Sequence, residues 1–112
     1  MNGIEQGSII LAHLQNPTEK FWGVLLRLDP IGLQLRGLNV SSFDDWLSQA
    51  VSGETPTLEP ATMFIPLARV ERLFLDEEVG VVESYSQRFA RRVGLTVEEY
   101  LGLEVPGGSE PS

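Results

Sequence analysis

The residues of this chain that could do chemistry are few and widely spaced. His13 is the only histidine, and cysteine is absent, which excludes thiolate catalysis, disulfides and cysteine-based metal sites. His13 falls in an apolar run that predicts a strand, where a lone histidine is typical of a structural or surface residue. The sequence contains no Ser-His-Asp grouping that can be argued, no G-x-S-x-G elbow and no glycine-rich phosphate loop. We therefore expect no catalytic residues and a function that is not enzymatic.

Two short acidic runs could suggest a divalent cation, namely Asp44-Asp45 and Asp76-Glu77-Glu78. The ligand spacing of a calcium-binding loop is absent from both. Carboxylates near the start of a helix also stabilise its positive end, by roughly 0.3–1 kcal/mol each. We prefer this explanation and expect neither a metal site nor a cofactor.

The charge of the chain bears on its partners. Acidic residues outnumber basic ones 16 to 8, for a net charge of −8. Such a charge repels DNA and RNA at long range unless cations gather on one face. Nucleic acid is therefore an unlikely partner, and we expect the chain to bind itself or another protein. The candidate interaction surface consists of Trp46, Arg69, Arg72, Arg88, Arg91 and Arg92.

The elements that must position these residues begin with β-strands. Ile9 to Gln15 is a short apolar run that ends at Asn16-Pro17, which predicts a strand followed by a turn. Phe21 to Leu28 is apolar on both faces except at Arg27, which is typical of a central, well-covered strand.

A hairpin and two further strands follow. Asp29 to Gly32 predicts a tight turn, because proline presets φ at its second position and glycine ends it. Leu33 and Leu35 then alternate with polar residues, as in a half-buried strand. Ala61 to Asp76 predicts two more strands, and Pro66 places the first of them at an edge or breaks it.

A short helix is expected near residues 43–51, inserted between these β-segments. Ser42 can cap it, with Asp45 completing an approximate capping box. Apolar residues recur at helical spacing: Phe43, Trp46, Leu47 and Ala50. Aromatic residues at this spacing are typical of a core, so Trp46 is expected to cover the sheet, with partner binding as the alternative.

The segment from Glu83 to Glu104 predicts a helical hairpin with the geometry of a DNA-binding helix-turn-helix. Tyr85, Phe89 and Val93 form one apolar line, and Gly94 then permits a left-handed turn. Thr96 and Glu99 form a capping box that starts a second helix, Val97 to Glu104. That second helix has only acidic charged residues, and β-structure is expected directly before the hairpin, where a helix-turn-helix would have a further helix. We therefore expect a docking hairpin and not a DNA reader.

The β portion resembles the Sm-like family of small barrels, in which a strongly bent five-stranded sheet closes on itself. The first pattern is Gly23-x-Leu25-x-x-Leu28-Asp29, similar to the family motif in which a glycine lets strand two bend and an aspartate closes that strand. The second pattern runs from Ile65 to Leu73 and keeps the spacing of the motif that joins strands four and five by one turn. The likeness covers roughly residues 7–76, and several SH3-like barrels share this strand rhythm.

The resemblance implies a fold more than it implies RNA binding. Family members that bind RNA place an asparagine shortly after the position of Asp29, where this chain has Ile31, Gly32 and Leu33. They also carry an arginine-glycine pair where this chain has Pro66-Leu67. The resemblance therefore implies association of copies through sheet edges, as a ring or a dimer, rather than RNA recognition.

These patterns predict an α+β domain, mainly β. We expect an Sm-like or SH3-like five-stranded small barrel in residues 1–80, a helical hairpin packed on it in 81–104, and a disordered tail in 105–112. The leading hypothesis is a non-enzymatic interaction or assembly module that self-associates. Two alternatives stay open, a divergent Sm-like RNA or nucleic-acid binder and a domain that binds a small ligand between barrel and helices.

The expected location is the cytoplasm, without membrane association. The absence of cysteine suits a reducing compartment. The apolar run from Ile9 to Leu14 is too short for a signal peptide, and no segment approaches the roughly 20 apolar residues of a membrane span.

Overall fold

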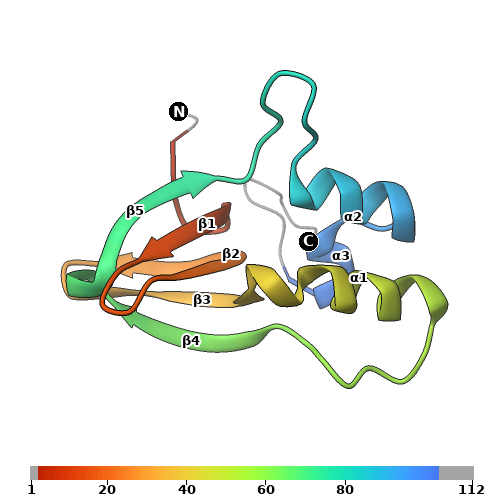
Figure 1. Cartoon of the computed structure of the whole chain (residues 1–112), viewed down its shortest axis with the longest axis horizontal. Helices are drawn as coiled ribbons and strands as arrows, with labels where there is room; N and C mark the ends of the chain where they lie inside the picture. Colours follow the sequence, from red (N-terminus) through yellow and green to blue (C-terminus); the bar gives the residue numbers. More distant parts are fainter. Residues whose placement is uncertain (1–2, 104–112) are drawn as a thin grey trace, which may run out of the picture.

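The computed structural model describes residues 3–103, which form one antiparallel five-stranded sheet and three α-helices (Figure 1). The expected α+β architecture, mainly β, is confirmed. Neighbouring strands follow the order β4-β3-β2-β1-β5. The elements are β1 (Ile9–Leu14), β2 (Glu19–Asp29), β3 (Gly32–Asn39), the 3₁₀ turn η1 (Val40–Ser42), α1 (Phe43–Ser52), β4 (Ala61–Pro66), the 3₁₀ turn η2 (Leu67–Arg69), β5 (Val70–Leu75), α2 (Tyr85–Val93) and α3 (Val97–Leu101).

A pair of facing glycines lets the backbones of β2 and β3 approach closely. Gly23 pairs directly with Gly37. A Cβ added to Gly23 would lie 2.4 Å from the carbonyl oxygen of Arg36 and 2.6 Å from the Cα of Gly37. No larger residue fits this backbone approach without moving one of the strands.

The inner face of the sheet encloses a core that is built from strands. Its buried members are Ile10, Ala12, Leu14, Leu25, Leu33, Leu35 and Ile65, and half-buried side chains from η2 and β5 pack against them. Because no α-helix contributes to this cluster, the sheet must curl around it to keep it from water. Figure 1 shows β4 and β5 curving around the central strands.

The outer face of the sheet carries the second core, which the helices cover. Its buried members are Trp22, Val24 and Leu38 from the sheet together with Phe43, Trp46, Leu47, Phe89 and Val97 from the helices. The apolar line of α2 is as expected, since Tyr85 and Val93 pack against the same cluster on either side of Phe89. The helical hairpin is therefore part of the same packed unit as the sheet.

Two expectations from the sequence are wrong. The expected closed barrel is absent from the described part of the chain, where β4 and β5 end the sheet and do not pair with each other. The stretch after Gly80 is not helical until Tyr85, because Val79 and Val82 pair as an antiparallel bridge. The predicted tail, residues 105–112, and Glu104 lie outside the described residues.

The helix starts follow local capping chemistry, with one exception. The expected capping box of Thr96 and Glu99 is present at α3, and a second box of Ser84 and Gln87 starts α2. Gly94 ends α2 with φ 93°. Ser42 makes no side-chain cap at α1, because a 3₁₀ turn precedes the helix and Asn39 accepts the hydrogen bond of Ser41 N there.

Between residues 3 and 103, none of the helices combines the length and apolar character that crossing a membrane requires.

Candidate interaction surfaces

Trp46 does not belong to the accessible surface. Its side chain is 1% exposed, and its ring stacks on Phe89 with centroids 4.7 Å apart and planes 20° from parallel. Trp22 lies 5.5 Å from it on the sheet side. Placing Trp46 in an interaction surface is therefore corrected: the apolar stripe of α1 faces the sheet, and burial of the indole holds the helix there.

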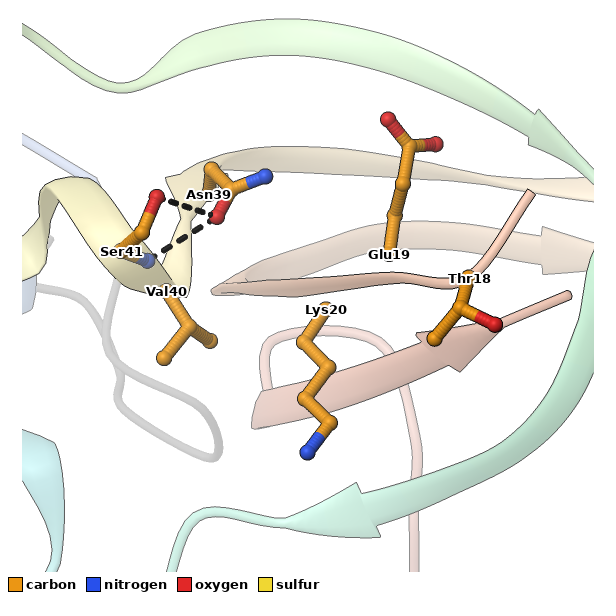
Figure 2. Close-up of a pocket in the computed structure, with 6 residues that line it drawn as sticks. All are labelled: Thr18, Glu19, Lys20, Asn39, Val40 and Ser41. Carbon is orange, nitrogen blue, oxygen red and sulfur yellow. Dashed lines mark hydrogen bonds between the residues drawn. The ribbon is translucent and has the colours of Figure 1, made fainter.

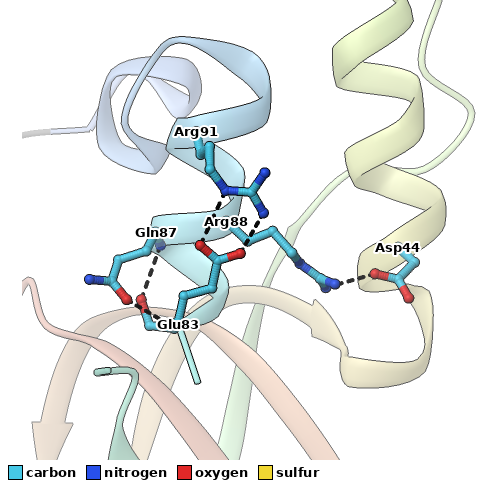
Figure 3. A network of polar contacts seen from close by, with 6 residues as sticks. Asp44, Glu83, Gln87, Arg88 and Arg91 are labelled. Carbon is cyan, nitrogen blue, oxygen red and sulfur yellow. Dashed lines mark hydrogen bonds and ion pairs between the residues drawn. The ribbon is translucent and has the colours of Figure 1, made fainter. Parts of the chain in front are cut away.

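Arg88 and Arg91 on α2 are engaged in contacts within the molecule (Figure 3). The Arg88 guanidinium donates to Asp44 Oδ1 at 2.7 Å and lies 5.1 Å from the ring centroid of Phe43. It thereby links α2 to the first turn of α1. Arg91 pairs with Glu83, and this hydrogen bond is the main cause of the lowered pKa of Glu83 and the raised pKa of Arg91.

Arg69 links η2 to the connection between β1 and β2. Its guanidinium donates to the carbonyl oxygens of Gln15 and Pro17 and pairs with Glu19 at 2.9 Å. These contacts hold η2 against the connection between β1 and β2. They indicate a structural role, since both Nε and Nη2 of Arg69 donate to groups of the protein itself.

The structure does not gather the candidate arginines on one surface. The β4–β5 connection that holds Arg69 lies at the opposite end of the sheet from α2 (Figure 1). Arg72 lies between them on β5 and pairs with Glu71 at 3.4 Å. Arg92 makes no ion pair with the part of the chain that the structure describes. The convergence that a nucleic-acid interface requires is not seen for these residues.

The helical hairpin packs beside α1, the expected inserted helix, so a third helix supports it even though β-structure directly precedes it. α1 packs against α2 through Phe43 and Tyr85, whose ring centroids are 4.9 Å apart. α3 nevertheless has five residues, and its charged side chains are Glu98 and Glu99. A reading helix needs donors for phosphates and base edges, which α3 lacks.

The two edge strands of the sheet are β4 and β5. β4 pairs with β3 and β5 pairs with β1, so each has one side without a strand partner among residues 3–103. Each also carries an exposed aromatic ring: Phe64 is 51% exposed and Phe74 is 40% exposed. Pro66 at the end of β4 is as expected for an edge strand. The edge position of β5 was not predicted, because it depends on pairing with β1, which is far away in sequence.

A shallow, open hollow lies beside the connection between β1 and β2 and the end of β3 (Figure 2). Its volume is about 360 Å³, and it is lined by Thr18, Glu19, Lys20, Asn39, Val40 and Ser41. A second hollow of about 360 Å³ lies between the N-terminal segment and α3, with Val24, Leu26 and Leu103 in its lining. Over the described range the titratable side chains form no group of three that could hold a metal ion.

Comparisons of the chain with protein-family models, curated proteins and solved structures find no match.

Proposed function

We propose that the chain is a non-enzymatic assembly module that self-associates by pairing β4 of one copy with β5 of the next. The observation behind this proposal is the open sheet, whose two edges both lack a strand partner in the described residues. An unpaired edge offers a row of backbone donors and acceptors to another strand. Because the two edges differ, the contact is heterologous, and it builds a ring if the rotation closes.

The side chains beside the edges favour this pairing. Phe64 on β4 pairs with Gln34 on β3, and Phe74 on β5 pairs with Leu11 on β1. Both partners point to the outer face, so both rings lie there as well. Met63 and Leu73 are half-buried on the inner face at the same two edges. Pairing of β4 with β5 of another copy would place Phe64 beside Phe74 on the outer face and Met63 beside Leu73 on the inner face. Only registers that differ by an even number of residues keep these side chains on matching faces.

The proposal includes membership of the Sm-like or SH3-like small barrels. Three features of the chain support it: the antiparallel order β4-β3-β2-β1-β5, the glycine of β2 that the backbone of β3 approaches closely, and the single 3₁₀ turn between β4 and β5. Pairing of edges between copies would complete a sheet that is open in the single chain.

The test is the mass of the wild-type protein by size exclusion with light scattering, at about 1 to 100 μM. We expect a species well above the monomer mass of 12.4 kDa, and a clean monomer throughout this range would overturn the proposal. Phe64→Lys should weaken association at least about tenfold, because it puts a charge beside the β4 edge. Leu95→Lys, at a 45% exposed leucine between α2 and α3, is the matched control and should associate like wild type.

A further inference from the structure

Lys20, His13 and Arg72 lie side by side across three neighbouring strands. His13 on β1 pairs directly with Lys20 on β2 and with Arg72 on β5. Directly opposite residues in a sheet point to the same face, so the three side chains form one row on the outer face. We call these three residues the cationic row.

This row is unusual in a chain with a net charge of −8. Lys20 and Arg72 carry like charges on either side of His13, so an anion between them would reduce their mutual repulsion. Glu71 supplies one carboxylate, 3.4 Å from Arg72. Glu19, next to Lys20, points away from it in Figure 2 and pairs with Arg69. Lys20 makes no ion pair within residues 3–103.

The charges of the row act on His13. Its pKa is lowered from the ordinary value, first by burial and then by the charges of Lys20 and Arg72, while Glu71 acts in the opposite direction. The row therefore presents two permanent cations on either side of an imidazole that stays neutral near pH 7. An anion bound over the row would lower the repulsion and favour a protonated His13.

An aromatic surface adjoins the row. Phe74 follows Arg72 on the same face of β5, and its ring meets that of His13 with centroids 4.8 Å apart at 62°. This ring is 40% exposed, so a flat ligand ring could stack on it. On the other side, Lys20 borders the shallow hollow, with the side chains of Thr18 and Val40 on the same side of the backbone (Figure 2). Cations, an exposed ring and adjoining space thus occur together.

We propose that the cationic row binds the phosphate of a nucleotide-sized ligand whose ring stacks on Phe74. Lys20 and Arg72 contact the phosphate oxygens from two strands, and both ring nitrogens of His13, between them, become donors when the imidazole is protonated. All four side chains of the site belong to one copy of the chain, although Arg72 and Phe74 lie on β5, the edge strand that the proposed assembly pairs with a second copy.

The test is a binding titration with AMP at low salt, followed by NMR, in wild type and in single variants. We expect AMP to bind with a Kd below about 1 mM, ribose 5-phosphate about tenfold more weakly, and adenosine weakly or not at all. Lys20→Gln and Arg72→Gln should each weaken AMP at least about fivefold. Phe74→Leu should bring AMP down to the level of ribose 5-phosphate. Arg92→Gln, an arginine of α2 outside the row, is the control and should bind as wild type does.

A second readout is the imidazole itself. AMP or inorganic phosphate should raise the pKa of His13, because an anion stabilises the protonated ring. The proposal is overturned if AMP does not bind at about 10 mM, or if Lys20→Gln and Arg72→Gln bind it like wild type. Binding of a single-stranded oligonucleotide without binding of AMP would also overturn it, in favour of a nucleic-acid strand.

Discussion

The indole nitrogen of Trp22 donates a 3.0 Å hydrogen bond to the carboxylate of Asp76, which lies 54 residues later in the chain. The same carboxylate accepts the backbone N–H groups of Tyr85 at 2.9 Å and Ser86 at 2.8 Å. Asp76 therefore joins the core of the sheet to the first turn of α2, where a negative charge also suits the helix dipole. The place of Asp76 in the acidic run at residues 76–78 is thus explained by the start of α2.

Asp76→Ala should lower the free energy of unfolding by about 2–3 kcal/mol, because it leaves three donors without their acceptor. Urea unfolding followed by tryptophan fluorescence measures this loss. Glu77→Ala is the matched control and should change stability by no more than about 0.5 kcal/mol. Equal effects of the two variants would show that Asp76 does not hold α2.

Gly23→Ala should destabilise the protein by about 2 kcal/mol or more, since the new methyl group meets the backbone of β3 at Arg36 and Gly37. Thermal unfolding is a sufficient measure. At Gly3 an added Cβ meets nothing within 4 Å, so Gly3→Ala should unfold at the wild-type temperature. An unchanged unfolding temperature in Gly23→Ala would mean that the close approach of β2 and β3 does not require a glycine at this position.

Trp46→Ala should cost about 3–5 kcal/mol, because the indole fills the space between the sheet, Phe43 and Phe89. Trp46→Phe should cost less and keep the near-ultraviolet circular dichroism of a packed aromatic core. Val51→Ala changes an exposed residue of the same helix and serves as the control. A stable, native-like Trp46→Ala protein would contradict the role of Trp46 in the core.

His13 should titrate below its ordinary value of 6.5 in the folded protein. The unfolded chain then takes up a proton on His13 before the folded protein does, as pH falls through 6.5. This group therefore contributes stability at higher pH, and the contribution is lost as pH falls from about 6.5 through the lowered pKa. NMR titration of the imidazole measures the pKa directly.

The variant His13→Gln isolates the same effect in stability measurements. Wild type should lose more stability than His13→Gln between about pH 7.5 and 5.5, since the carboxylates of both proteins titrate alike. A wild-type imidazole that titrates at or above 6.5, with Lys20 and Arg72 intact, would contradict the arrangement of the cationic row.

Local patterns in the sequence were sufficient for much of the fold. The tight turn at Asp29 to Gly32, the left-handed Gly94 and the capping box of Thr96 and Glu99 all depend on residues within a few positions of one another. Such features follow from backbone sterics and short-range hydrogen bonds. The alternation of apolar residues likewise predicted the faces of β3, because side chains alternate along any strand.

Long-range packing decided the remainder. Whether Trp46 is core or surface depends on which face of the sheet α1 covers, and Asp76 caps a helix that starts nine residues later only because Trp22 and β5 bring it there. The open edges of β4 and β5 depend on the order of strands. The cationic row could not be read from residues 13, 20 and 72, since only strand pairing makes them neighbours.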